Sequence, residues 1–133
     1  MTFDISEDQI KRTETGLGRK LPPIYRGIMM KRNGGSLLAN GEEWELHPLK
    51  DTSERGRAAQ SVNHVFAETE AAQEWRAFPN GAVAIGSNEA GDVMMLLRSP
   101  SNPEIFADQI FVFFHETGRI KFLAEDLSVF EIR

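Results

Sequence analysis

The sequence contains no cysteine. This absence excludes disulfide bonds, thiolate nucleophiles, iron–sulfur clusters and zinc sites built on cysteine ligands. A chain of 133 residues, of which 41% are hydrophobic, does not need such crosslinks, because folding at this size buries about two-thirds of the surface of the unfolded chain. We therefore expect a single domain, residues 1–133, that folds around an ordinary hydrophobic core.

Long hydrophobic runs are also missing. The longest apolar stretches, such as Ile110–Phe114, have the length of a β-strand, whereas a membrane-spanning helix needs about 20 apolar residues. The first residues, Met1 to Asp8, lack the basic segment and the apolar segment of a secretory signal. The sequence thus predicts no membrane partner and a cytoplasmic location.

Basic residues are fewer than acidic ones: 15 basic and 20 acidic residues give a formal net charge of −5. Proteins that bind nucleic acid through its phosphates need a basic surface, so we expect no nucleic-acid partner. An acidic balance favours instead a basic partner, which it attracts over a distance.

Capping signals predict the helices. Ser6 is a typical N-cap residue, and Gln9 is expected to return the second hydrogen bond of a capping box. Glycine and asparagine enter the left-handed backbone region at low cost, which is typical of helix ends. Four helices are expected, from Ser6 to Gly18, from Leu21-Pro22-Pro23 to Asn33-Gly34-Gly35, over Arg57–Trp75 and over Glu125–Ile132.

The remaining apolar segments have the length and alternation of strands. In the first of them Trp44 and Leu46 are expected to point inward. Because short turns join most neighbouring strands, the pairing should be antiparallel, and the predicted class is α+β, a mostly antiparallel sheet flanked by helices. The predicted strands are Glu43–His47, Ala82–Ile85, Asp92–Leu97, Gln109–Phe114 and Arg119–Phe122.

The sequence contains no clear metal-binding, phosphate-binding or catalytic pattern. His47, His64 and His115 lack the short spacing of metal-binding histidines, so no metal is predicted. The glycine-rich segment Gly86–Gly91 precedes a strand and not a helix, which favours a hairpin turn over a phosphate loop. In that turn Asp92 is expected to accept hydrogen bonds from backbone N–H groups. We predict no catalytic residue, no cofactor and no enzymatic activity.

Several short patterns occur in a fixed order between about residues 14 and 130. They are Leu17-Gly18 followed by Leu21-Pro22, Tyr25-Arg26 and Asn33-Gly34-Gly35; Trp44-x-Leu46; Ile85-Gly86-Ser87 with Gly91-Asp92; and His115-Glu116-Thr117-Gly118 before Leu127 and Phe130. In this order they resemble the SUKH superfamily, specifically its branch named for the fungal Smi/Knr cell-wall regulators.

This resemblance implies an α+β domain that serves as a protein-interaction scaffold. Many bacterial members are immunity proteins, which neutralise a cognate polymorphic toxin by binding it directly. The leading hypothesis is therefore a non-catalytic protein that covers the active site of a toxin, which is basic if the toxin is a nuclease. The alternative hypothesis is a housekeeping regulatory or scaffold module that binds an endogenous protein. The sequence leaves the oligomeric state open.

Acidic and aromatic side chains are the candidates for contact with this partner. Carboxylates can imitate the phosphates of a nuclease substrate, and aromatic side chains dominate the binding energy of many interfaces. The alternation around Trp44 favours a core position for it, whereas Trp75 is expected to be exposed. The loops Leu37–Glu42, Asp51–Gly56 and Arg98–Ala107 are expected to set partner choice. The candidate partner-binding residues are Glu42, Glu43, Trp44, Trp75, Glu89 and Asp92.

Overall fold

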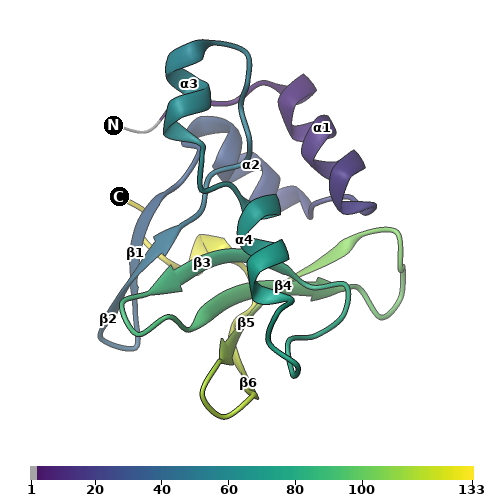
Figure 1. Cartoon of the computed structure of the whole chain (residues 1–133), viewed down its shortest axis with the longest axis vertical. Helices are drawn as coiled ribbons and strands as arrows, with labels where there is room; N and C mark the ends of the chain where they lie inside the picture. Colours follow the sequence, from purple (N-terminus) through teal and green to yellow (C-terminus); the bar gives the residue numbers. More distant parts are fainter. Residues whose placement is uncertain (1–2) are drawn as a thin grey trace.

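The computed structural model describes residues 3–133, which form an antiparallel sheet with helices packed around it (Figure 1). The helices are α1 (Glu7–Leu17), α2 (Pro23–Lys31), α3 (Arg55–Gln60) and α4 (Val65–Ala72), and a short 3-10 turn covers Leu127–Val129. The strands are β1 (Gly35–Ala39), β2 (Glu42–Leu46), β3 (Val83–Asn88), β4 (Val93–Arg98), β5 (Phe106–Phe114) and β6 (Arg119–Ala124). They pair in sequence order, each antiparallel to the next, so the predicted α+β class is confirmed.

The sheet is covered on both faces near its middle. One face packs against α2, where Tyr25 and Met29 are buried, and against the C-terminal segment that carries Leu127. The other face lies under α4 and the segment after it, which contributes Phe78. This double cover explains why no part of Met94 or Met95 is exposed, although their side chains point to opposite faces of β4.

Helix α1 begins and ends where the sequence predicts. The Ser6 side chain accepts a hydrogen bond from the Gln9 N–H at 3.4 Å, and Gly18 adopts a left-handed conformation with φ of 74°. The predicted return bond of the capping box is wrong. Gln9 is buried and faces the interior, so its Oε1 accepts a hydrogen bond from the Thr52 N–H at 3.1 Å. That bond ties α1 to the segment before α3.

The predicted helix Arg57–Trp75 is wrong, because the chain forms two short helices there, α3 and α4. Between them, Ser61 is buried and accepts a hydrogen bond from the Asp51 N–H at 3.0 Å. His64 then caps the second helix, accepting a hydrogen bond from the Ala67 N–H through Nδ1 at 3.2 Å. These two contacts stop one helix and start the next.

The predicted loop Leu37–Glu42 is also wrong, because most of it belongs to the β1–β2 hairpin. Asn40 and Gly41 occupy the turn with φ of 53° and 78°, the pattern of a two-residue type I′ turn. Leu37 lies opposite Trp44, and both side chains are buried. The hairpin thus adds a sixth strand at the edge of the sheet.

The predicted helix Glu125–Ile132 is reduced to the 3-10 turn. Beyond it the chain is extended and runs beside β1. The Arg133 N–H donates to the Ser36 carbonyl at 2.8 Å, and the Ser36 N–H donates to the Arg133 carbonyl at 2.9 Å. Pairing with the strand outcompetes further helix formation.

Candidate protein-binding surface

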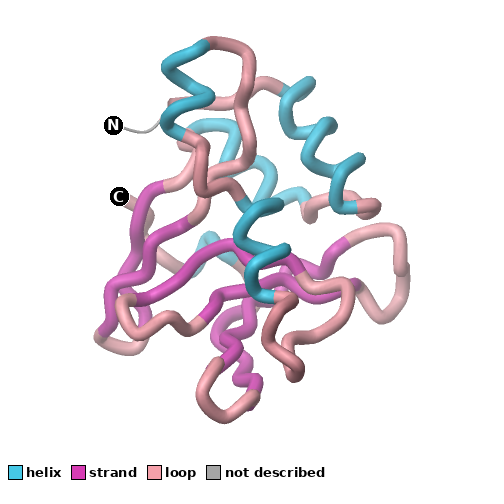
Figure 2. The backbone as a smooth tube through the Cα atoms, viewed as in Figure 1, coloured by secondary structure: helices cyan, strands magenta, loops and turns pink. Residues whose placement is uncertain are grey.

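Three hairpin turns emerge at one end of the sheet. In an unbroken antiparallel sheet the β1–β2, β3–β4 and β5–β6 turns must leave on the same side, and the other two connections on the opposite side. Figure 2 shows the first two of these turns at the left of the molecule and the third below them. We call residues 40–43, 88–92 and 115–119 the hairpin end.

A network of hydrogen bonds fixes two of these turns to each other. The Asp92 N–H donates to Asn88 Oδ1 at 2.8 Å, and Asn88 Nδ2 donates to Asp92 Oδ2 at 3.3 Å. Asn88 Nδ2 also lies 3.4 Å from Glu42 Oε2, which belongs to the first strand after the β1–β2 turn. The Asn88 amide therefore holds the β3–β4 turn in shape and links it to β2.

The same network continues to the third turn through a histidine. His115 Nδ1 lies 3.0 Å from Asp92 Oδ1, and both side chains are largely buried. The indole of Trp75 stacks on the imidazole with ring centroids 5.3 Å apart. Gly91 lies close by, since a Cβ built on it would lie 3.4 Å from the imidazole Cε1. A carboxylate, an indole and a glycine thus fix the position of His115.

Asp92 does not play the predicted role of accepting hydrogen bonds from turn N–H groups. The side chain of Asn88 accepts the N–H of the turn instead, which leaves the Asp92 carboxylate to bond with His115. Asn88 and His115 were missing from the predicted site. His115 belongs to a recognisable sequence pattern, but the contact itself joins residues 23 positions apart in sequence, and only the pairing of β4 with β5 brings them together.

Four exposed carboxylates surround this network. Glu42 and Glu43 follow the first turn, Glu89 lies in the second and Glu116 in the third. Within residues 3–133, none of the four forms an ion pair with a basic side chain. Their charges are therefore not neutralised by direct pairing.

An apolar strip borders the acidic turns. Phe111 lies opposite Phe122 and Phe113 opposite Ile120 in the β5–β6 pair, so these four side chains share one face of the sheet. Ile120 and Phe122 are 46% and 48% exposed. Trp75 packs on the buried Phe113 at 5.9 Å between ring centroids and is itself 36% exposed. We define the apolar strip as Trp75, Phe111, Ile120 and Phe122.

The predicted contact residues are only partly brought together. Glu42, Glu43, Glu89 and Asp92 all lie at the hairpin end, and Trp75 joins them through His115. Trp44 does not, because its side chain is 3% exposed and packs in the core. A hollow of about 540 Å³ lies beside the network, between the second turn and the β5–β6 hairpin, and includes His115 and Lys121 in its lining.

The described part of the chain offers little other chemistry at this surface. Among residues 3–133 no group of three or more histidine, aspartate and glutamate side chains is placed to hold a metal ion. The Asp92–His115 pair orients an imidazole, and the carboxylates around it can accept hydrogen bonds from cationic groups. Across the same residues no helix is both long enough and apolar enough to span a membrane.

Comparison with known proteins identifies a family for this chain. A search of curated proteins found no match. The sequence model of the SMI1 / KNR4 family (SUKH-1) matches residues 4–133, nearly the entire chain. Membership of this family supports a protein-binding domain of the immunity type in general. On this match the chain belongs to the SMI1 / KNR4 family (SUKH-1), as the sequence patterns predicted.

Proposed function

We propose that this protein is a non-catalytic immunity-type binder, and that its hairpin end docks on a basic surface of a cognate toxin and occludes the active site. The observation that carries the proposal is the joining of unpaired carboxylates and an exposed apolar strip at one end of the sheet. The family match supports a protein partner, and the surface suggests where that partner is held.

The two parts of the surface have different physical roles. Aromatic and aliphatic side chains at the centre of an interface provide most of the binding energy, and here Trp75, Ile120 and Phe122 are available for that role. The carboxylates form an acidic border that attracts a basic partner and speeds the encounter. If the toxin is a nuclease, its catalytic cleft is basic, and the carboxylates occupy the positions of substrate phosphates.

Rigidity adds to affinity in this proposal. The bonds among Glu42, Asn88, Asp92 and His115 hold the second turn in one shape before any partner arrives. A surface ordered in advance loses less conformational entropy on binding than a flexible loop does. The proposed function therefore assigns the network a positioning role and no role in bond making or breaking.

The test compares two charge-reversed variants with equal numbers of substitutions. The first carries Glu42→Lys, Glu43→Lys and Glu89→Lys. The matched control reverses three exposed acids that lie outside the hairpin end, Glu70, Glu104 and Glu131. The wild-type protein is immobilised, toxin-containing fractions of the native host are passed over it, and the retained protein is identified and purified.

Association of the purified toxin is then measured with each variant at low and at physiological salt. We expect the hairpin-end variant to associate at least about tenfold more slowly at low salt, and the control to stay near wild type. The wild-type protein should also inhibit the toxin's activity at stoichiometric concentration. Equal effects of the two variants would refute the proposed surface. Retention of a housekeeping protein, with no toxin inhibited, would favour the regulatory alternative.

A further inference from the structure

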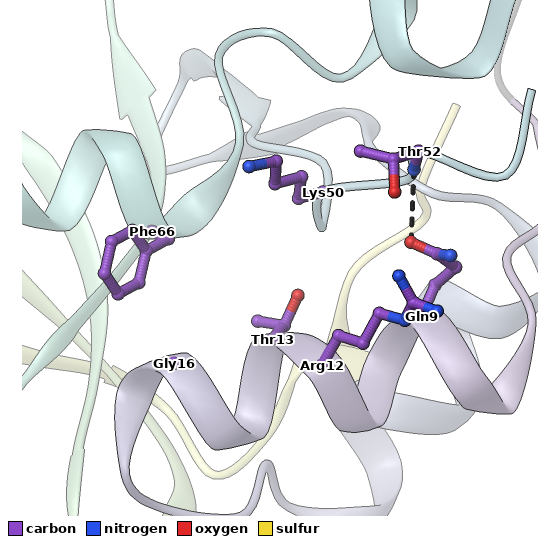
Figure 3. A pocket seen from close by; sticks show the side chains of 7 residues that line it. All are labelled: Gln9, Arg12, Thr13, Gly16, Lys50, Thr52 and Phe66. Atoms are coloured by element: carbon purple, nitrogen blue, oxygen red, sulfur yellow. Dashed lines mark hydrogen bonds between the residues drawn. The ribbon is translucent and has the colours of Figure 1, made fainter. Parts of the chain in front are cut away.

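A second hollow lies on the helical side of the molecule, away from the hairpin end. It opens between α1, the segment around residues 50–52 and the start of α4, and has a volume of about 300 Å³ (Figure 3). Pockets of this size suit small molecules. Its lining residues come from three separate parts of the chain: Gln9, Arg12, Thr13, Gly16, Lys50, Thr52 and Phe66.

Two buried polar side chains form the floor of this pocket. Gln9 is 6% exposed and Thr13 is 7% exposed. Apart from the backbone bonds of α1, the one hydrogen bond among the lining residues runs from the Thr52 N–H to Gln9 Oε1 at 3.1 Å. Figure 3 shows the Thr13 hydroxyl pointing from α1 toward the segment that carries Lys50. Among residues 3–133 the Thr13 hydroxyl has no hydrogen-bond partner and is not sealed from solvent, so it is free to donate to a molecule in the hollow.

Positive charge gathers at the mouth of the pocket. Within residues 3–133, Lys50 forms no ion pair, and Arg12 pairs only with Asp8, at 3.1 Å on the exposed side of α1. The pKa of His64 lies below its usual value, first because of burial and second because of the charge on Lys50. Figure 3 shows the Lys50 side chain extending toward the side of the pocket where Phe66 lies. Of the residues that the structure describes, no acidic side chain lines the pocket.

One wall of the pocket is aromatic. The Phe66 ring lies against α1 at Gly16, where an added Cβ would be 3.4 Å from the ring Cε2. The absence of a side chain at Gly16 lets the ring approach the helix closely. Phe66 is 36% exposed, so one part of its surface remains available for stacking.

We propose that this pocket binds a small aromatic carboxylate, with the carboxylate on Lys50 and Thr13 and the ring against Phe66. Both polar residues have a donor to offer, and ammonium and hydroxyl groups are suitable donors to a carboxylate. The site is separate from the hairpin end, so the inference does not depend on the proposed toxin-binding function.

The test titrates the full chain with phenylacetate, followed by amide chemical shifts in NMR spectra. Phenylacetamide, which has the same shape and no charge, is the control ligand. We expect saturable binding of phenylacetate with a dissociation constant of about 1 mM or lower, and shifts confined to residues 9–16, 50–52 and 64–67. Phenylacetamide should bind at least about tenfold more weakly, since it lacks the charge-assisted hydrogen bonds.

Variants of single residues make the test specific. Lys50→Met should weaken phenylacetate binding at least about tenfold and Thr13→Val by about threefold or more. Lys31→Met removes an exposed lysine on α2 that lines none of these hollows and should leave the affinity unchanged. Unchanged spectra of the unliganded variants outside the pocket show that the fold is retained. Equal binding of the two ligands, equal losses for Lys50→Met and Lys31→Met, or shifts spread over the surface would overturn the proposal.

Discussion

His47 gives the clearest quantitative prediction. It follows β2, is 5% exposed, and its Nδ1 is buried with no hydrogen-bond partner among the described residues. Burial disfavours the charged imidazolium and lowers the pKa of His47 from its ordinary 6.5 to about 4. In the folded protein this side chain is therefore neutral down to mildly acidic pH.

The sign of the effect on stability follows from proton binding. Between pH 6.5 and pH 4 the unfolded chain protonates His47 and the folded protein does not, so the free energy of unfolding decreases as the pH falls. With these two pKa values, His47 alone should remove about 2–3 kcal/mol of stability between pH 7.5 and pH 4.5. That is a large fraction of the 5–15 kcal/mol typical of small proteins.

Urea unfolding followed by tryptophan fluorescence measures this quantity. The free energy of unfolding is determined at both pH values for the wild type and for His47→Leu, which cannot titrate and has no polar atom to leave unpaired. Because all other titrating groups are common to both proteins, their contributions cancel in the comparison. The wild type should lose about 2–3 kcal/mol more than the variant. If the wild type and His47→Leu lose the same free energy of unfolding between the two pH values, and His47→Gln gives the same result, the burial argument is refuted.

Three substitutions test contacts that hold the fold. Asn33→Ala removes two buried hydrogen bonds to Leu49, of 2.7 and 2.8 Å, and should cost about 2–4 kcal/mol in urea unfolding; a cost below about 1 kcal/mol would contradict this. Thr69→Val leaves the Ala84 N–H without its 2.9 Å partner and should cost about 1–3 kcal/mol. Thr69→Ser keeps a hydroxyl group at this position and should retain most of the wild-type stability. Gly91→Ala puts a side chain at a φ of 90° and should lower stability by about 1–2 kcal/mol. This loss is measured as a lower midpoint temperature of thermal unfolding.

Local signals in the sequence were sufficient for much of the fold. Ser6 and Gly18 mark the limits of α1 because caps act within one turn of the helix. The alternation around Trp44 and Leu46 predicts both the strand and its buried face, since successive strand side chains point to opposite sides. These features depend on neighbours in sequence, so the sequence alone reveals them.

Features that depend on distant residues were not predictable in this way. The break between α3 and α4 requires the buried contact between Ser61 and Asp51, and the extended C-terminal segment requires pairing with Ser36. The candidate surface shows the same division. Acidic residues were recognised by type, but the position of Trp75 over His115 depends on how the segment after α4 folds back on the sheet.

The pairing of Ser36 with Arg133 has a consequence for self-association. A strand at the border of a sheet exposes unpaired backbone groups that can recruit a strand from another molecule. Here the final residues of the chain occupy part of that border along β1, and Gly35 lies so close to the Arg133 carbonyl that an added Cβ would be only 2.5 Å away. Removal of Ile132 and Arg133 would uncover the donor and acceptor of Ser36, and the exposed border of β1 could then pair with a strand of another molecule.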